Sequence, residues 1–279
     1  MIALLLAATL TLPPQKADAT IGAVAIHLES GRRVSVRGEE RFPMGSVYKF
    51  PIALAVLHLV DGGKLSLEQK VTIGVHDFSP GWSPIRDKAK GQAVTLPVKE
   101  LLRSMVAVSD NTACDSLLRL IGGPSVVQRR LGELGFAGTH VNRQERDIAD
   151  ELHQAGGVER YASDPRDSAT PMDMTRLLVA LWRGQDGLTA RSHAMLMQWM
   201  TETETGPRRI KAAMPAGSIV AHKTGTMPGT CNDAAIVTST GGKHHVVVVV
   251  FTKTGKAELE SREDDLAAAA RAAYDAVVR

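Results

Sequence analysis

The stretch Val246-Val247-Val248-Val249-Val250, within residues 243–252, decides the fold, because five consecutive β-branched residues favour a strand that is buried on both of its faces. Two further segments with strand composition precede it, residues 218–226 and residues 233–240, and Gly241-Gly242 supplies the turn that leads into it. The C-terminal third of the chain is therefore expected to form three consecutive antiparallel strands.

A second strand pattern lies near the start of the chain. Residues 20–30 alternate in polarity and end at Gly31, and residues 33–36 follow, which predicts a β-hairpin. An alanine-rich helix is expected at residues 259–278. Apolar residues at helical spacing fill the middle of the chain and predict helices at 46–60, 98–108, 112–121, 125–134, 171–182 and 189–203.

These elements predict an α/β (α+β) fold with one antiparallel sheet built from both chain ends, flanking helices and an inserted all-helical lobe. We assign residues 20–41 and 208–279 to the α/β lobe and residues 42–207 to the helical lobe. The polar stretch from Asn142 to Thr170 is too long for an ordinary connection, and loops of this length are usually functional.

Composition excludes several classes of protein. The chain has 279 residues, of which 44% are hydrophobic and 23% charged, so it can bury a large core and is not disordered. A net charge of +3 without a basic cluster argues against a nucleic-acid partner. The chain has only two cysteines, Cys114 and Cys231, so no disulfide framework is possible. The two residues either form one disulfide bond or are both free thiols.

The N-terminus predicts a signal peptide at residues 1–19. Ile2 to Leu12 is a largely apolar run that is too short to span a bilayer, and Ala17-Asp18-Ala19 provides a small-x-small cleavage site. The usual positive region is missing, because no Lys or Arg precedes Lys16; a buried N-terminal helix is the alternative. We expect an exported protein, periplasmic or secreted, that is not inserted in the membrane after cleavage.

Ser46 and Lys49 are the first pair of residues that could carry chemistry. A serine at a helix N-terminus lies where backbone N–H groups favour developing negative charge. Lys49, three residues on, places an amine one turn away on the same face, where it could take the proton of the serine. Taken alone, the pair does not establish this chemistry, because a helix cap followed by a surface lysine gives the same pattern and S-x-x-K occurs by chance in many chains.

Two more motifs follow. Ser109-Asp110-Asn111 separates two predicted helices and could point a hydroxyl and an amide into a cleft, although the same residues suit an ordinary helix cap. Lys223-Thr224-Gly225-Thr226 ends a predicted strand, where the glycine would let a substrate approach the backbone and the lysine would hold a carboxylate.

Residues 20–279 resemble the class A serine β-lactamases, which are enzymes of antibiotic resistance. The resemblance rests on the motifs S-x-x-K, S-D-N and K-T-G, which occur here in the same order and at similar separations. The second triplet Lys253-Thr254-Gly255 follows the last strand, so we interpret it as a strand-end turn. Further matches are Arg41-Phe42-Pro43-Met44, Ile121-Gly122-Gly123-Pro124 and Asp164-Pro165-Arg166-Asp167.

The resemblance implies a base that hydrolyses the acyl-enzyme, and here the chain departs from the usual pattern. A gapless alignment puts Ile148 at the position of the base, and Ile148 cannot act as one. Alignment with the long-loop, extended-spectrum cephalosporinase-like subgroup puts Glu145 there instead, with Asp147 and Glu151 as alternatives. Ala149 replaces a polar residue that usually contacts the water. If Glu145 is not the base, it is expected to pair with a neighbouring arginine and to hold the loop.

The resemblance also implies roles for the remaining residues. Ser46 would be the nucleophile, its N–H and that of Thr226 the oxyanion hole, and Lys49 or Glu145 the acylation base. Ser109 would give a proton to the β-lactam nitrogen, and Asn111 would hold the amide side chain of the substrate. Lys223 and Thr224, next to Gly225 and Thr226, would bind the substrate carboxylate. Trp82 would be an aromatic gate beside the cleft, or it would only pack within its loop.

No cofactor is expected. His244-His245 would face opposite sides of a strand, and the cysteines lack zinc spacing, so we expect no metal site. His222 is expected to be structural.

The sequence predicts a monomeric β-lactamase acting on small β-lactams. The first alternative is a penicillin-binding protein or DD-peptidase-like acyltransferase with slow deacylation. The second, a non-catalytic β-lactam sensor domain, would need a membrane-spanning partner.

Overall fold

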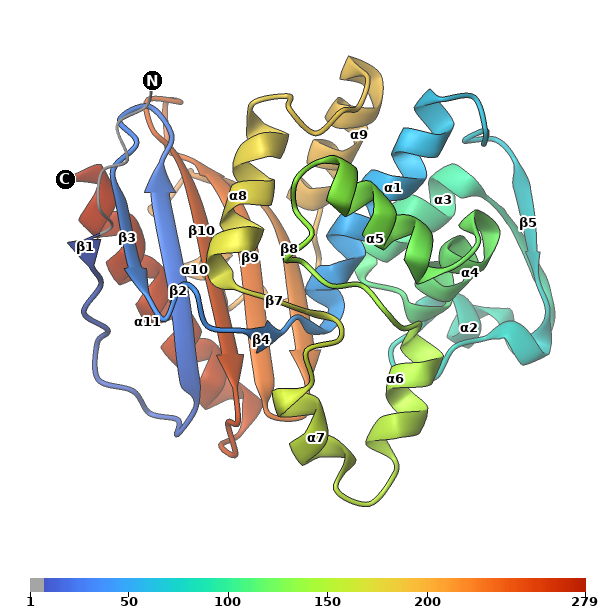
Figure 1. Ribbon diagram of the computed structural model, residues 1–279, viewed down its shortest axis with the longest axis horizontal. Helices are drawn as coiled ribbons and strands as arrows, with labels where there is room; N and C mark the ends of the chain where they lie inside the picture. Colours follow the sequence, from blue (N-terminus) through green and yellow to red (C-terminus); the bar gives the residue numbers. More distant parts are fainter. Residues whose placement is uncertain (1–7) are drawn as a thin grey trace.

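The computed structural model describes residues 8–279 and contains a six-stranded sheet in the order β1-β3-β2-β10-β9-β8 (Figure 1). All neighbouring strands pair antiparallel except β1 and β3, which are parallel. Both chain ends therefore contribute to one sheet, as predicted. The strands are β1 (Ala8–Thr9), β2 (Thr20–His27), β3 (Arg33–Val36), β8 (Ile219–Met227), β9 (Thr230–Thr238) and β10 (His245–Lys253).

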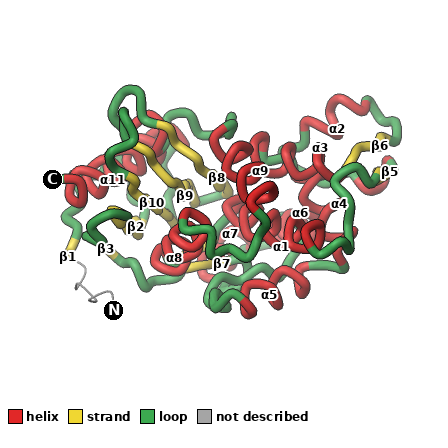
Figure 2. The backbone as a smooth tube through the Cα atoms, turned by 90° about the horizontal axis from the view of Figure 1, so that it is seen from above, coloured by secondary structure: helices red, strands yellow, loops and turns green. Residues whose placement is uncertain are grey.

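The central strand β10 is buried on both faces, as its valine run predicted. Val247 and Val249 belong to the core that the sheet shares with the helical lobe, whereas Val246 and Val248 belong to the core on the other face. The helix α8 (Pro171–Trp182) packs on the first face and α11 (Leu259–Val278) on the second. Figure 2 shows the sheet between these two helices, with most of the remaining helices gathered on the β8 side. The short helix α10 (Ile210–Ala213) instead packs against α11.

The other helices are α1 (Lys49–Asp61), α2 (Pro84–Ala89), α3 (Val98–Arg103), α4 (Asn111–Ile121), α5 (Pro124–Glu133), α6 (Glu145–Leu152), α7 (Gly157–Ser163), α9 (Ala190–Thr201) and α10 (Ile210–Ala213). Of these, the sequence predicted α1, α3, α4, α5 and α9 within a few residues. The short helices α2, α6, α7 and α10 were not foreseen. The inserted lobe is also not all-helical, because β5 (Lys70–Ile73) pairs with β6 (Val94–Pro97) and β4 (Phe42–Pro43) with β7 (Ser168–Ala169). Strands of two to four residues leave too little alternation to be recognised.

The polar stretch 142–170 is not a bare loop, since it contains α6 and α7. A buried ion pair anchors its two ends: Nε of Arg143 donates to Asp167 at 2.6 Å, and the other oxygen of Asp167 accepts from the backbone of Asn142 at 2.7 Å. These contacts are tertiary, which is why the local sequence did not reveal two helices here. The segment reaches the candidate site through Glu145, which lies against Lys49.

The first seven residues of the predicted signal peptide lie outside the described residues. Residues 8–19 pack along the sheet edge: Leu10 is buried, and the backbone N–H groups of Lys16 and Ala17 donate to the carboxylate of Asp265 on α11. This segment is a strand and an extended chain rather than the helix that was the alternative. Among residues 8–279, no helix is both long and apolar enough to cross a membrane.

Candidate active site

Ser46 lies on a single 3₁₀ turn, η1 (Gly45–Tyr48), which runs directly into α1 and packs against β8. The close approach requires Gly225 in β8, because a Cβ there would lie 2.2 Å from the carbonyl oxygen of Met44 and 3.1 Å from the backbone nitrogen of Ser46. The sequence predicted that this glycine admits substrate. In the structure it admits the turn that carries Ser46.

Lys49, one turn after Ser46, is completely buried. Its Nζ lies 3.1 Å from Oγ of Ser46 and 2.9 Å from a carboxylate oxygen of Glu145. It also donates to the carbonyl oxygen of Ser109 at 2.8 Å and to Oδ1 of Asn111 at 2.6 Å. The amine therefore joins residues from three distant parts of the sequence at one point.

Ser109 follows a π-helical turn, η3 (Ser104–Val108), and adopts a left-handed backbone conformation with φ of +64°. Both features are uncommon and are found preferentially at functional sites. The Oγ atom of Ser109 accepts a hydrogen bond of 2.9 Å from Nζ of Lys223 in β8. The second and third motifs thus contact each other directly, and Lys49 of the first motif contacts the second through Ser109 and Asn111.

Lys223 is fully buried, and its burial, reinforced by the nearby Lys49 ammonium, lowers the pKa of Lys223 well below its usual value. Thr224 is buried beside it, and Thr226 is exposed at the end of the strand. The second triplet lies elsewhere, at the end of β10, where Lys253 donates to the carbonyl oxygen of Arg41. It is a strand-end turn, as predicted.

The sequence reasoning missed Arg209, whose side chain is buried beside β8. Its guanidinium donates to the carbonyl oxygen of Gly225 at 3.2 Å and to Oγ1 of Thr226 at 2.6 Å, and it pairs with Glu263 at 3.0 Å. Nothing in the adjacent pair Arg208-Arg209 distinguishes this residue from a surface arginine. It brings a fixed positive charge to the end of the cleft.

Glu145 is the first residue of α6 and is buried against Lys49. Its backbone N–H donates to one oxygen of Asp115 at 2.7 Å, and the N–H of Arg146 donates to the other at 3.2 Å. Burial raises the pKa of Asp115, on α4, to about 6. Asp115 was also missed, although an acidic residue inside the apolar segment 112–121 is a signal that could have identified it.

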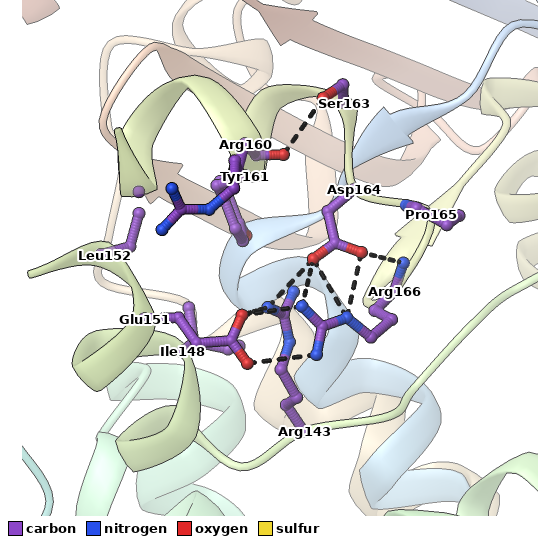
Figure 3. Close-up of a pocket in the computed structure, with 11 residues that line it drawn as sticks. Arg143, Ile148, Glu151, Leu152, Arg160, Tyr161, Ser163, Asp164, Pro165 and Arg166 are labelled. Carbon is purple, nitrogen blue, oxygen red and sulfur yellow. Dashed lines mark hydrogen bonds and ion pairs between the residues drawn. The ribbon is translucent and has the colours of Figure 1, made fainter. Parts of the chain in front are cut away.

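The other candidate bases lie elsewhere. Asp147 is exposed and caps the first turn of α6. Glu151 pairs with Arg143 at 2.6 Å and with Arg166 at 2.7 Å, beside a cavity of about 310 Å³ (Figure 3). Burial alone would raise the pKa of Glu151, but the guanidiniums of Arg166 and Arg143 outweigh it and lower this pKa. Ile148 is buried in the core. Neither neighbouring arginine pairs with Glu145, so the loop-holding alternative is not what the contacts show.

Trp82 lies in the loop before α2 with 59% of its surface exposed, so packing within the loop does not bury it. Its indole Nε1 donates to the carbonyl oxygen of Val108 at 2.9 Å, and its carbonyl oxygen accepts from the N–H of Asn111 at 2.9 Å. These bonds fix the indole at a cleft of about 460 Å³. The cleft is also lined by Ser46, Ser109, Glu204, Thr205, Gly206, Pro207, Arg209, Thr224, Thr226, Leu259 and Glu263.

Among residues 8–279, no group of three or more His, Cys, Asp or Glu side chains is arranged to hold a metal ion. Cys114 and Cys231 are both free and buried. His222 makes a buried hydrogen bond of 3.0 Å with Asp233, as expected of a structural histidine. His244 precedes β10 rather than lying in it, and its Nδ1 is 3.0 Å from Nε2 of His27.

Comparison with known proteins gives consistent matches over nearly the whole chain. Residues 6–277 match the model of the beta-lactamase enzyme family. The extended-spectrum beta-lactamase PER-1 of Pseudomonas aeruginosa is 33% identical over 263 residues, 92% of this chain and 82% of that protein. The crystal structure of a beta-lactamase from Chitinophaga pinensis matches with a TM-score of 0.83 and 35% identity, covering 93% of this chain and 94% of that one. A variant of the class A beta-lactamase of the last common ancestor of Gram-negative bacteria has a TM-score of 0.83 and 33% identity, covering 94% of both chains.

Proposed function

Because the chain belongs to the beta-lactamase enzyme family and is a class A serine β-lactamase, we propose that Ser46 is its nucleophile and that Glu145 is the base that hydrolyses the acyl-enzyme. The observation that carries the proposal is the position of the Lys49 amine, 3.1 Å from Oγ of Ser46 and 2.9 Å from the carboxylate of Glu145.

Acylation begins with attack of Oγ of Ser46 on the lactam carbonyl carbon. The N–H groups of Ser46 and Thr226 hold the oxygen that becomes negative. A Lys49 ammonium donates its three protons to Oγ of Ser46, the carbonyl oxygen of Ser109 and Oδ1 of Asn111, and it has no lone pair with which to accept another. The carboxylate oxygen of Glu145, 2.9 Å from Nζ, makes no hydrogen bond within the described residues and is therefore the acceptor at hand. Lys49 must therefore pass a proton to Glu145 before it can take the proton of Ser46. Alternatively, Glu145 takes that proton through a water molecule.

Opening of the ring requires a proton on the lactam nitrogen. The Oγ–H of Ser109 can supply it, because the Oγ atom already accepts a hydrogen bond from Lys223. That hydrogen bond stabilises the negative charge left on Ser109 until it is reprotonated. The Lys49 ammonium then replaces the proton lost by Ser109, and Glu145 returns to Lys49 the proton that it took during acylation, so that Glu145 is a carboxylate again before deacylation.

The cleft has complementary groups for the rest of the substrate. Thr224 and Arg209 line the cleft and suit the carboxylate that lies next to the lactam nitrogen, and the fully buried Lys223 adjoins Thr224. The amide nitrogen of Asn111 suits the acylamino side chain, and Trp82 covers the mouth of the cleft. In deacylation, Glu145 removes a proton from water, the resulting hydroxide attacks the ester carbonyl, and Ser46 leaves with a proton returned by Lys49.

We further propose an extended substrate spectrum, because the relative PER-1 is named an extended-spectrum beta-lactamase. We propose that this spectrum includes cephalosporins, in line with the resemblance to the long-loop subgroup. The enzyme would act as a monomer after export, in the periplasm or outside the cell, without membrane insertion. A penicillin-binding protein or DD-peptidase-like acyltransferase is disfavoured, because a buried carboxylate touches Lys49 beside the nucleophile.

The test is hydrolysis of a chromogenic cephalosporin by the wild type and by Ser46→Ala. We expect sustained turnover by the wild type and none by the variant, with a mass increase of one substrate on the wild type alone at early times. A wild type that stalls as a permanent adduct would support the acyltransferase instead. Turnover by Ser46→Ala would refute the nucleophile.

A further inference from the structure

A second cavity of about 450 Å³ lies behind Trp82 and is not used by the groups described so far. It is separated from the active-site cleft by two residues that line both, Trp82 and Glu204. Its apolar walls come from Ile85, Val94, Leu96 and Val108. The cleft and this cavity therefore lie on the two sides of Trp82 and Glu204, and we call these two residues the Trp82–Glu204 wall.

The wall stands at the carboxylate end of the cleft. Val108, which accepts the indole N–H of Trp82, immediately precedes Ser109, and Glu204 is followed by Thr205, whose hydroxyl contacts that of Thr224. The backbone N–H of Glu204 donates to the carbonyl oxygen of Ala107 at 2.9 Å, which fixes its position on the cleft rim.

The charge on this wall is negative. The carboxylate of Glu204 is exposed and makes no hydrogen bond or ion pair within residues 8–279. Two cations lie on the cavity wall: Arg103 is already paired with Glu202 at 2.9 Å, and the charge of Lys88 is balanced by that of Glu100 on the same wall. An exposed indole face beside an unpaired carboxylate is a surface that attracts an aromatic cation.

We propose that Trp82 and Glu204 form a subsite for a cationic substituent at C3 of a cephalosporin, such as a pyridiniomethyl group. The inference rests on the proposed function, because the substrate carboxylate at C4 must lie on Thr224 and Arg209. The neighbouring carbon C3 then directs its substituent toward the wall. The cation meets Glu204, its ring stacks on Trp82, and its edge enters the apolar cavity.

The experiment compares two cephalosporins that share one side chain at C7 and differ only at C3, pyridiniomethyl in one and acetoxymethyl in the other. The measured quantity is the ratio of their kcat/KM values, which reports only the steps through acylation, so later loss of the substituent does not enter. We expect Glu204→Gln to lower this ratio about two- to fivefold and Glu204→Lys to lower it further. Added salt should lower the wild-type ratio and leave that of Glu204→Gln nearly unchanged.

The matched control is Glu100→Gln, on the cavity wall away from the cleft, which should leave the ratio within twofold of wild type. Equal ratios for wild type and Glu204→Gln, with both substrates still hydrolysed, would overturn the subsite while the proposed function stands. A ratio lowered by Glu100→Gln but not by Glu204→Gln would also overturn it. If the wild type hydrolyses neither substrate, the proposed function fails, and the subsite fails with it.

Discussion

At the scale of single residues, Asp115 shows how a side chain outside the catalytic set positions one inside it. Both of its oxygens accept backbone N–H groups at the start of α6, including that of Glu145. It also accepts the hydroxyl of Ser79 at 2.6 Å. An amide at this position has only one accepting oxygen, so at least one of these bonds must be lost.

We therefore expect Asp115→Asn to lower kcat about ten- to a hundredfold, because a displacement of about 1 Å in a catalytic group costs rate on this scale. Steady-state kinetics and intact-protein mass check this, with acyl-enzyme accumulating in the variant. An unchanged kcat would show that the start of α6 holds Glu145 without Asp115.

Asp115 also predicts a pH dependence of stability. Its pKa is about 6 in the folded protein, above the value of 3.8 for an unperturbed carboxyl. The folded state therefore binds the proton more tightly, and this contribution to stability is complete below about pH 4 and lost as pH rises through 6. The free energy of unfolding of the wild type relative to Asp115→Asn should rise by up to about 3 kcal/mol between pH 7 and pH 4. Denaturant titrations at the two pH values measure the difference, and an unchanged difference would contradict the assignment.

At this scale, the sequence predicted contacts between residues of one motif, but it did not predict their contacts with residues elsewhere in the chain. Ser46 and Lys49 lie one turn apart, so their contact follows from helix geometry. The contact between Ser109 and Lys223 crosses 114 positions and came only from family resemblance. Asp115 and Arg209 belong to no motif, and only the tertiary structure shows what they hold.

At the scale of elements, the site depends on how closely β8 approaches the turn that carries Ser46. Gly225 is the contact point, and a methyl group there would lie 2.2 Å from a backbone oxygen, roughly 1 Å too close. Either the strand or the turn must move.

We expect Gly225→Ala to lower kcat/KM at least about a hundredfold. The control is Gly132→Ala in α5, where an added Cβ meets no atom within 4 Å. That variant should keep full activity and gain up to about 1 kcal/mol in stability, because alanine is the better helix former. A fully active Gly225→Ala would mean that the approach is not needed.

Long periodic elements were the predictable ones. The helix at 259–278 was predicted with its observed bounds, since twenty residues of alanine-rich sequence give a strong signal. The segment 142–170 was expected to be a loop, but it contains α6 and α7. Asp115 on α4 accepts the first N–H groups of α6, and the Arg143–Asp167 pair joins the two ends of the segment. The composition of the segment does not indicate such tertiary contacts.

At the scale of the whole molecule, the described part of the predicted leader behaves as a folded segment. The carboxylate of Asp265 is buried and accepts hydrogen bonds from the backbone N–H groups of Lys16 and Ala17. Cleavage after Ala19 would leave it without them and would uncover the site of Leu10.

We expect a protein that begins at Thr20 to be less stable than the full chain by at least about 2 kcal/mol, and so to melt about 4–8 °C lower. Thermal unfolding of the two forms measures this, and the mass of the exported protein shows which form exists in the cell. Equal melting temperatures would show that residues 8–19 add nothing to the fold.

The most direct measurement is intact-protein mass during cephalosporin turnover by Glu145→Gln, with Asp147→Asn as the matched control, since both change a carboxylate of α6 to an amide. We expect acyl-enzyme on Ser46 to persist for minutes in Glu145→Gln, while the wild type and Asp147→Asn return to the free mass as the substrate is consumed. Rapid deacylation by Glu145→Gln, at the wild-type rate, would contradict the assignment of Glu145 as the hydrolytic base.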